Sequence, residues 1–374
     1  MKVRAAVLDA FASPRPYAES SPLTIEELVL DPPGPSELLV RIESAGVCHS
    51  DLSVVEGVRR WPLPLALGHE AAGVVEEVGA GVRDVEPDDH VVLTFMPSCG
   101  TCRECAGGRP ALCSAAAAAN AEGRMLSGGC RLHRGGSDVH HHLGVSAFAE
   151  RAVVARGSAV VVPEDVPLDT AALFGCAVLT GVGAVLETAG VRPGESVAVF
   201  GLGGVGLSAV MGAAVAGAYP IVAVDPVADK RALALELGAT AALDASGAEE
   251  ALLDLSGGGV RYAFEAVGAT PVLEAAYRCV ARGGTTVAIG LPAPTAEAKI
   301  SASILVTGSR TLVGSYMGSA APQRDIPRLL DLWRARRLPV ERLQSATLDL
   351  EDVNGALDAL SEGHVVRQII RPRS

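Results

Sequence analysis

The sequence lacks a long uninterrupted hydrophobic run. Of its 374 residues, 49% are hydrophobic, and the mean hydropathy is +0.33. These values reflect abundant alanine and valine, because no apolar stretch reaches the ~18 residues that a membrane-spanning helix requires. We therefore expect no membrane partner, and the length suits two domains of ordinary size.

The amino terminus lacks the features of a secretory signal. It reads Met-Lys-Val-Arg-Ala-Ala-Val-Leu, which is typical of an opening strand and contains neither an apolar central region nor a cleavage site. We expect a soluble cytoplasmic protein whose cysteines remain reduced.

A stripe of basic residues is also absent. The chain carries 31 Lys and Arg against 43 Asp and Glu, a net charge of −12, and its largest basic cluster is the short stretch at residues 334–337. This balance disfavours nucleic acid as a partner. The chain also lacks sequence repeats and low-complexity linkers, which disfavours a repeat architecture.

Four of the eight cysteines are closely spaced, at Cys99, Cys102, Cys105 and Cys113. Four thiolates at such spacing can surround Zn²⁺ tetrahedrally, since the nearby glycines and Pro110 permit the turns that direct the sulfurs inward. A closed four-thiolate site has no position for a substrate, so the pattern predicts a structural zinc. A redox or disulfide cluster is the alternative, which the absence of a secretory signal disfavours.

The sequence pattern of the chain changes near Pro163. Before it, short β-type runs alternate with Gly and Pro turns, which is typical of a twisted antiparallel or barrel-like domain. After it, strands and helices alternate in the βαβ rhythm of a parallel sheet. The expected strands are residues 38–42, 72–78, 90–95, 152–162, 196–200, 220–224, 261–266, 285–289 and 311–313, and the expected helices are residues 169–186, 207–216, 230–237 and 272–281.

A glycine-rich loop, with Gly201, Gly203 and Gly206, follows one expected strand and opens a helix. Asp225 ends the next strand about 20 residues further on, which completes a dinucleotide-binding fingerprint. The glycines let the backbone approach a pyrophosphate at the helix N-terminus. Asp225 would accept hydrogen bonds from a ribose and repel a 2′-phosphate, so we expect NAD rather than NADP. A helix N-cap is the alternative role for this aspartate.

Three further segments contain Cys48, His69 and Cys176, in the contexts Gly-Val-Cys-His-Ser-Asp, Leu-Gly-His-Glu-Ala-Ala-Gly and Leu-Phe-Gly-Cys-Ala-Val-Leu-Thr-Gly. Considered singly, each is typical of a buried thiol or a core histidine. Together with the four-cysteine cluster and the glycine loop, in this order, they resemble the zinc-containing medium-chain alcohol dehydrogenases. The resemblance covers almost the whole chain and is closest to the long, liver-type or class III-like branch, because residues 114–148 form its extra segment.

The resemblance implies a second, catalytic zinc held by Cys48, His69 and Cys176, with a fourth position open to water or alcohol. Zinc lowers the pKa of bound water from 15.7 to about 7, and an alcohol should respond in the same direction before hydride passes to the nicotinamide. Asp51 matches the carboxylate that orients the metal histidine, and Glu70 lies beside the metal.

By the same resemblance, Ser50 matches a hydroxyl that passes the proton toward solvent. Ser53 replaces the histidine that ends this relay in many relatives, and a serine is no base near neutrality. We therefore expect the proton to travel from Ser50 through a ribose hydroxyl and water, with help from His49.

The remaining implied cofactor contacts are distributed along the chain. They comprise Lys230 at the adenosine ribose, His49 and Arg367 at the pyrophosphate, Val205, Val267 and Leu291 beside the nicotinamide, and Thr180 beneath it.

The implied fold class is α/β, with a doubly wound Rossmann domain and a mainly-β GroES-like catalytic domain. The expected boundaries are residues 1–177 for the first catalytic part, 178–318 for the NAD domain and 319–374 for the return to the catalytic domain. The extra segment favours a homodimer.

The expected reaction is NAD-dependent oxidation of a primary or secondary alcohol to an aldehyde or ketone. Trp61 and Phe95 favour an apolar or aromatic substrate, although Trp61 and Leu63 could be packing residues. Arg59 and Arg60 could instead attract a carboxylate or phosphate, although exposed arginines are usually solvated.

Three alternatives remain open. A nicotinoprotein would keep its NAD bound, and a non-catalytic zinc-stabilised scaffold would not need an open metal position. A thiol-dependent formaldehyde dehydrogenase is disfavoured, because the loop at residues 58–62 reads Val-Arg-Arg-Trp-Pro where such relatives have an acidic patch.

Two cysteines and several histidines remain without a motif. Cys279 is expected to be a core thiol, and Cys130, in a glycine-rich loop, could be exposed and oxidisable. His133 and the run at residues 140–142 are interpreted as packing residues of the extra segment.

Overall fold

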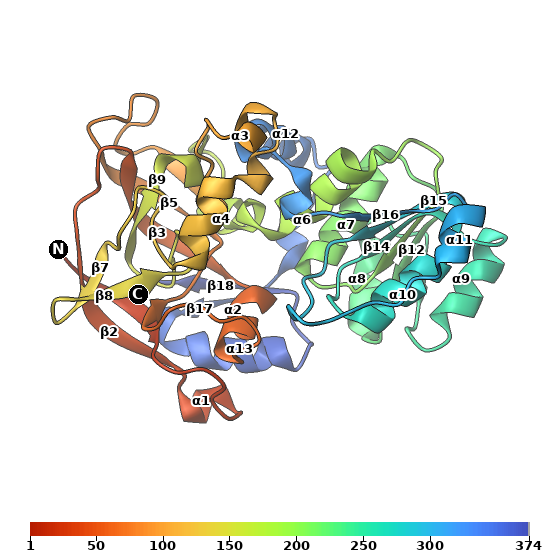
Figure 1. Ribbon diagram of the computed structural model, residues 1–374, viewed down its shortest axis with the longest axis horizontal. Coiled ribbons are helices and arrows are strands. Elements are labelled where there is room, and N and C mark those ends of the chain that lie inside the picture. The colour runs from red at the N-terminus through yellow and green to blue at the C-terminus, as the bar shows by residue number, and fades with distance from the viewer. Residues whose placement is uncertain (373–374) are drawn as a thin grey trace. The chain divides into compact units, whose positions relative to one another are not determined.

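A computed structural model describes residues 1–372 of the chain (Figure 1). The chain forms two compact units. Unit 1 contains Met1–Cys176, Ala321–Pro327 and the chain from Gln344 onward, and unit 2 contains Ala177–Ala320 and Arg328–Leu343. The structure thus groups residues 328–343 with unit 2, whereas the sequence boundaries place them in the returning catalytic segment.

Unit 1 is built mainly from strands. They are β1 (Lys2–Leu8), β2 (Leu23–Leu30), β3 (Glu37–Val47), β4 (Leu65–Ala66), β5 (Ala71–Val78), β6 (His90–Leu93), β7 (Leu132–Arg134), β8 (Ser137–His141), β9 (Arg151–Ala155), β10 (Ala159–Val162), β17 (Gln344–Asp349) and β18 (Arg367–Arg371). A closed barrel follows the order β1-β2-β7-β8-β4, and a seven-stranded sheet follows the order β10-β6-β5-β3-β18-β17, with β9 paired to β3.

Strand β3 is buried along most of its length because its two faces meet different cores. Successive side chains of a strand point to opposite faces. Accordingly, Leu38 and Val40 pack in one hydrophobic cluster with Leu93 and Phe148, whereas Leu39 packs in another. The apolar run at residues 38–40 therefore suits a part of the strand that is covered on both sides.

Unit 2 contains a six-stranded sheet with the order β13-β12-β11-β14-β15-β16. Its strands are β11 (Val197–Phe200), β12 (Ile221–Val224), β13 (Ala241–Leu243), β14 (Val260–Glu265), β15 (Val280–Ala288) and β16 (Thr311–Gly314). All neighbours are parallel, and Val197 of β11 pairs with Ile221 on one side and Tyr262 on the other. This strand order is that of a doubly wound Rossmann sheet, which confirms the predicted fold class.

Helices connect and flank these sheets (Figure 1). They are α1 (Tyr17–Ser20), α2 (His49–Val55), α3 (Arg103–Ala106), α4 (Ser114–Ala121), α5 (Leu168–Ala172), α6 (Ala177–Gly183), α7 (Gly204–Ala216), α8 (Ala228–Glu236), α9 (Ala248–Ser256), α10 (Thr270–Arg278), α11 (Ala302–Thr307), α12 (Pro322–Arg334) and α13 (Val353–Ser361). Short 3-10 turns cover Pro110–Leu112, Arg156–Ser158, Leu173–Gly175, Met317–Ser319, Val340–Leu343 and Leu350–Asp352, and a π-helix covers Ala184–Ala189.

Two predicted elements are interrupted in the structure. The expected strand at residues 152–162 is split by the turn Arg156–Ser158 into β9 and β10. The expected helix at residues 169–186 is broken at Cys176, whose backbone angles of φ −140° and ψ −72° leave the helical region. In residues 1–372 no single helix is long and apolar enough to cross a membrane; Leu168–Gly175 and Ala177–Ala189 reach that length only as a bent pair.

Candidate active site

Strand ends bring the predicted site residues of unit 1 together. Cys48 directly follows β3, His69 lies between β4 and β5, and Arg367 begins β18. Because β3 pairs with both β5 and β18, the ends of these three strands are neighbours. The break at Cys176 adds a fourth side chain to the same place.

The ligand atoms of Cys48, His69, Glu70 and Cys176 all lie within 4.8 Å of one another. All four side chains are buried. Two thiols, an imidazole and a carboxylate are donors that Zn²⁺ accepts. Both carboxylate oxygens of Glu70 are buried without a hydrogen-bond partner among the described residues. On the chemistry of this donor set, the residues fit a zinc ion.

Charges around the cluster favour a thiolate. A hydrogen bond from Cys176 holds the pKa of Cys48 well below its usual value, against the effect of burial, and the Arg367 guanidinium adds to this. Arg367 is buried, donates from Nη1 to the Val47 carbonyl oxygen at 3.0 Å and lies 3.5 Å from Glu70 Oε2. Burial raises the pKa of Glu70 to about 7 despite this guanidinium. The side chain of Arg367, predicted at the pyrophosphate, is therefore engaged with Glu70 and Val47.

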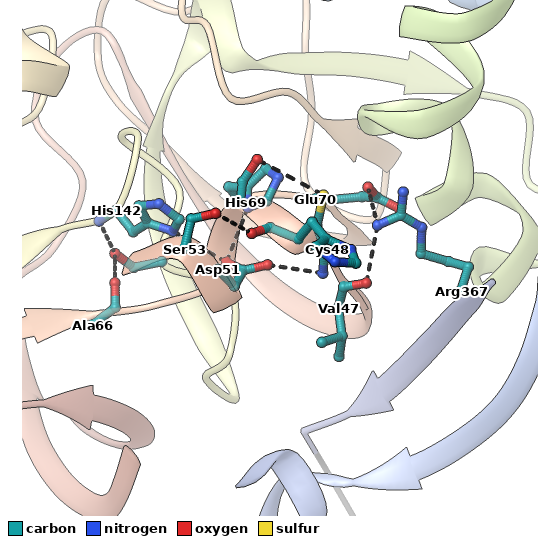
Figure 2. A network of polar contacts seen from close by, with 12 residues as sticks. Val47, Cys48, Asp51, Ser53, Ala66, His69, Glu70, His142 and Arg367 are labelled. Carbon is teal, nitrogen blue, oxygen red and sulfur yellow. Dashed lines mark hydrogen bonds and ion pairs between the residues drawn. The ribbon is translucent and has the colours of Figure 1, made fainter. Parts of the chain in front are cut away.

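Asp51 contacts His69 (Figure 2). The backbone N–H of Cys48 donates to Oδ2 at 3.0 Å, and His69 Nδ1 lies 3.0 Å from Oδ1. Burial acts to raise the pKa of Asp51, but His69 and His142 together lower it to about 2. The carboxylate orients His69 so that its other ring nitrogen, Nε2, is available to the cluster.

Ser50 and His49 of the predicted proton path lie on α2, as does Ser53, which stands in place of the relay histidine. Ser50 is half-buried, with its Oγ 3.9 Å from Cys48 Sγ, whereas His49 is exposed. The Ser53 hydroxyl donates to the backbone oxygen of His49 at 2.8 Å. Ser53 is therefore hydrogen-bonded within its own helix.

Aromatic side chains surround His69 and its neighbours. Phe95 contacts His69 edge-on, with ring centroids 5.8 Å apart. Trp61 packs against the unit 1 core, and its Nε1 donates to the Asn120 carbonyl oxygen at 2.8 Å. The Asn120 amide in turn donates to the Phe95 carbonyl oxygen at 3.0 Å. Arg60 stacks on Phe11 and donates to a backbone oxygen.

The sequence analysis missed His142 and Asn120. His142, interpreted as a packing residue, lies with Nδ1 3.3 Å from Asp51 Oδ1. The expectation for Cys130 was also wrong: its thiol is 6% exposed, and burial raises its pKa to about 11. Cys279 is a core thiol, as predicted.

The sulfurs of the closely spaced cysteines also lie within 4.8 Å of one another. Their sulfurs accept backbone N–H hydrogen bonds: Cys99 donates to Cys113, Cys102 to Cys99, and Cys105 to Cys102. The Cys105 N–H makes the largest contribution to lowering the pKa of the Cys102 thiol to about 6. The donor set is that of a closed four-thiolate zinc site.

In unit 2 the glycine loop joins β11 to α7. A Cβ at Gly206 would overlap the Gly201 carbonyl oxygen, whereas at Gly203 it would meet no described atom within 4 Å. Asp225 accepts backbone N–H bonds from Leu202 at 2.7 Å and Val227 at 2.8 Å, which hold its carboxylate at the strand ends. The space at Gly203 and the N-terminus of α7 fit a pyrophosphate.

The other predicted cofactor residues of unit 2 differ in exposure. Val267 and Leu291 are about half exposed, at 54% and 51%. Val205 is half-buried, and Thr180 is buried with a hydroxyl that has no hydrogen-bond partner in the described part of the chain. Lys230 is half-buried, and burial lowers its pKa.

Family comparisons match both units. Residues 34–164 match the family described as "Alcohol dehydrogenase GroES-like domain", and residues 204–335 match "Zinc-binding dehydrogenase".

Individual proteins match over nearly the full length. The chain is 41% identical over 99% of both chains to an NDMA-dependent alcohol dehydrogenase of Amycolatopsis methanolica. It is 40% identical to a geraniol dehydrogenase of Castellaniella defragrans, over 93% of this chain and 94% of the other. The solved structure of benzyl alcohol dehydrogenase from Acinetobacter calcoaceticus has a TM-score of 0.92, with 31% identity over 99% of both chains.

Proposed function

The chain belongs to the zinc-containing medium-chain alcohol dehydrogenases, which use zinc and NAD, and from this premise we propose how its residues divide the work. Cys48, His69 and Cys176 hold the catalytic zinc, and their convergence with Glu70 within 4.8 Å is the observation that carries the proposal. When bound, zinc supplies Lewis acidity toward an alcohol or carbonyl oxygen, and NAD supplies the hydride acceptor.

Cys99, Cys102, Cys105 and Cys113 hold a second, structural zinc. All four of its positions are taken by sulfur, so it serves the fold of the loop rather than the reaction. The proposal is thus two zinc ions per chain, one for each of the two groups that contain cysteine.

In unit 2, Gly201, Gly203 and Gly206 carry the pyrophosphate, and Asp225 with Lys230 holds the adenosine ribose. The carboxylate of Asp225, fixed by two N–H groups, disfavours a 2′-phosphate, which supports NAD over NADP. Val205, Val267, Leu291 and Thr180 form the nicotinamide side. Exposed His49 is the remaining candidate at the pyrophosphate, since the Arg367 side chain is engaged with Glu70 and the Val47 carbonyl oxygen.

Three further residues serve the catalytic zinc site. Asp51 holds the orientation of His69 through the 3.0 Å contact at Nδ1. Glu70, beside the ligands, adjusts the charge of the cluster. Ser50 passes the substrate proton toward solvent through a ribose hydroxyl and water, because Ser53 is hydrogen-bonded to the backbone of α2.

The substrate is a primary or secondary alcohol with an apolar or aromatic group. Phe95 and Trp61 supply aromatic surface next to His69 and His142. The similarity to geraniol and benzyl alcohol dehydrogenases favours the same class. The engagement of Arg60 with Phe11 makes it less suited to bind a substrate carboxylate.

A nicotinoprotein with tightly bound NAD is the second candidate. The 41% identity to an NDMA-dependent alcohol dehydrogenase is the observation that favours it. Such a protein would release coenzyme on denaturation and turn over without added NAD when another acceptor is supplied.

We also propose a homodimer in the cytoplasm. β16 is the last strand of its sheet, and Ile304, Val306 and Leu312 on or near it expose apolar side chains. An unpartnered edge strand with apolar neighbours suits a symmetric contact with a second copy. Six thiols used as metal ligands require a reducing compartment.

The experiment that tests the proposal combines zinc content with turnover. Purified protein should contain two zinc ions per chain, and Cys48→Ala should contain one and lose alcohol-dependent NAD reduction. Cys130→Ala, which removes another buried thiol of unit 1, should keep both properties. Aliphatic, benzylic and carboxylate-bearing alcohols should rank with benzylic substrates first. If the wild-type protein contains two zinc ions but shows no turnover, with or without an added acceptor, the protein is a non-catalytic scaffold.

A further inference from the structure

The Asp51 carboxylate is shared between two histidines. It is buried and receives the Cys48 N–H on Oδ2, while Oδ1 lies 3.0 Å from His69 Nδ1 and 3.3 Å from His142 Nδ1 (Figure 2). A metal-bound histidine needs only one carboxylate oxygen to fix its ring. The second histidine on that oxygen is therefore an additional feature of this site.

The backbone brings His142 to this position. β4 and β8 run parallel, with Leu65 opposite His140 and Ala66 opposite His141. His142 follows β8, and its N–H lies 3.2 Å from the Ala66 carbonyl oxygen and 3.0 Å from Ser146 Oγ. Since β4 leads to His69, the strand pair delivers both histidines to the same end of the barrel.

The ring of His142 is closely surrounded. It is fully buried and lies edge-on to His69 and to Trp61, with both centroid distances 5.3 Å. Among the described residues neither ring nitrogen meets the geometry of a hydrogen bond, and Nδ1 faces Asp51 Oδ1 as a close polar contact at 3.3 Å. Burial disfavours the charged imidazole, so the neutral ring with its proton on Nδ1 is the form that can donate to Asp51.

We propose that His142 is a positioning residue for the catalytic zinc site, which acts through Asp51 on the zinc ligand His69. The carboxylate pairs with Cys48 N–H and His69 Nδ1 and has His142 Nδ1 3.3 Å from the same Oδ1, in a buried place where an unpaired anion would be costly. The inference rests on the proposed zinc-binding role of His69.

Three substitutions distinguish the contribution of the His142 Nδ1–H group from that of its aromatic ring. His142→Asn places an amide near the Nδ1 position and removes the ring, whereas His142→Phe keeps an aromatic ring against Trp61 and removes the donor. His142→Gln places its amide nearer the Nε2 position. The matched control is His140→Asn, which lies two residues earlier in the chain, on β8.

The measurements are zinc affinity, by competition with a chromophoric chelator, and the visible absorption of the Co²⁺-substituted protein. We expect His142→Phe to lose zinc affinity by about 10-fold or more at one site, with a changed cobalt spectrum. His142→Asn and the control should stay within about 3-fold of wild type. The four-cysteine site in the same chain should keep its zinc in every variant, which reports an intact unit 1.

Two results would overturn the inference. One is a His142→Phe protein with wild-type affinity and spectrum, which would make the histidine a packing residue. The other is rescue by His142→Gln but not by His142→Asn, which would place the important contact at Nε2. If instead the wild-type protein binds one zinc only and Cys48→Ala loses none, the proposed function itself fails.

Discussion

At the scale of single residues, Ser50 is the hydroxyl proposed to carry the substrate proton. Its Oγ lies 3.9 Å from Cys48 Sγ. Because no other described hydroxyl of α2 is free of the helix backbone on this path, Ser50→Ala should lower the rate of alcohol oxidation by about 100-fold, the usual size of a lost proton-transfer group. Steady-state kinetics across a range of pH values would measure this loss.

Ser53→Ala is the matched control for Ser50→Ala. Its hydroxyl already donates to the His49 carbonyl oxygen, so its removal should change the rate less than about 3-fold. Full alcohol oxidation by Ser50→Ala at every pH would contradict the assigned path.

His141 predicts a pH dependence of stability. Burial lowers its pKa to about 4 from an ordinary value of 6.5. As the pH falls below about 6.5, the unfolded chain binds a proton that the folded state refuses, so the free energy of unfolding decreases until about pH 4. The loss attributable to this residue is about 3 kcal/mol.

Urea unfolding at pH 7 and at pH 5 would measure this effect by comparison with His141→Gln. The glutamine carbonyl can still accept the Arg131 N–H that His141 Nε2 accepts at 2.9 Å, but it does not titrate. The variant should lose less stability than wild type between the two pH values. Exposed His364 supplies the control His364→Gln, which should follow wild type. Parallel pH profiles for His141→Gln and wild type would refute the prediction.

Sequence reasoning identified residues that belong to motifs and missed those placed only by tertiary structure. Cys48, His69 and Cys176 stand in recognisable contexts, and the structure brings all three together. His142 has no local signal of its role, because its contact with Asp51 depends on the pairing of β4 with β8. Cys130 was misjudged for the same reason, since a glycine-rich loop does not reveal whether it folds inward.

At the scale of elements, the break at Cys176 was hidden by an apolar helical pattern. Residues 169–186 show an apolar helical pattern, yet α5 ends at Ala172 and α6 begins at Ala177. Periodicity reports which faces are buried but not where a helix must bend. The bend places the Cys176 sulfur among the other candidate ligand atoms. The requirements of the site thus override the local preference for a continuous helix.

The first turn of α7 has no room for a side chain at Gly206. A Cβ there would overlap the Gly201 carbonyl oxygen, so Gly206→Ala should displace the loop and weaken NAD binding by at least about 10-fold. Isothermal titration calorimetry would measure the dissociation constant. Zinc content should not change, since the proposed zinc ligands belong to unit 1.

Gly355→Ala is the matched control in α13. A Cβ at this position would meet no described atom within 4 Å, and alanine favours a helix interior by up to about 1 kcal/mol over glycine. This variant should bind NAD as wild type does. Unchanged NAD affinity in Gly206→Ala would show that the loop does not carry the pyrophosphate.

At the scale of the whole molecule, we predict that the dimer forms through the edge strand β16 and the preceding helix α11. Val306 is 75% exposed and Leu312 is 38% exposed. Charges at both positions oppose burial against a second copy, so the double variant Val306→Glu, Leu312→Glu should sediment as a monomer. Leu235→Glu, an exposed position on α8, should leave the dimer intact. A double variant that remains dimeric would place the interface elsewhere.

The division of the chain was largely accessible from the sequence. The change from Gly- and Pro-punctuated strands to the βαβ rhythm marks two architectures, and the parallel strand order confirms the Rossmann class. The assignment of residues 328–343 to unit 2 could not be anticipated, because α12 continues unbroken across the division between the units. Pro327 stands at this point inside α12, but a proline within a helix does not by itself indicate a change of unit.

The two cysteine clusters differ in solvent exposure, and this difference affects how fast each would exchange a bound metal ion. In the four-cysteine loop, Cys99, Cys102 and Cys105 are partly exposed, whereas Cys48, Cys176 and His69 are buried. A chelator or a metal-donating protein can therefore reach the sulfurs of the loop more readily than the ligand atoms of the buried trio. A zinc ion held by the four-cysteine loop would thus exchange faster, and one held by Cys48, His69 and Cys176 would have the longer residence time.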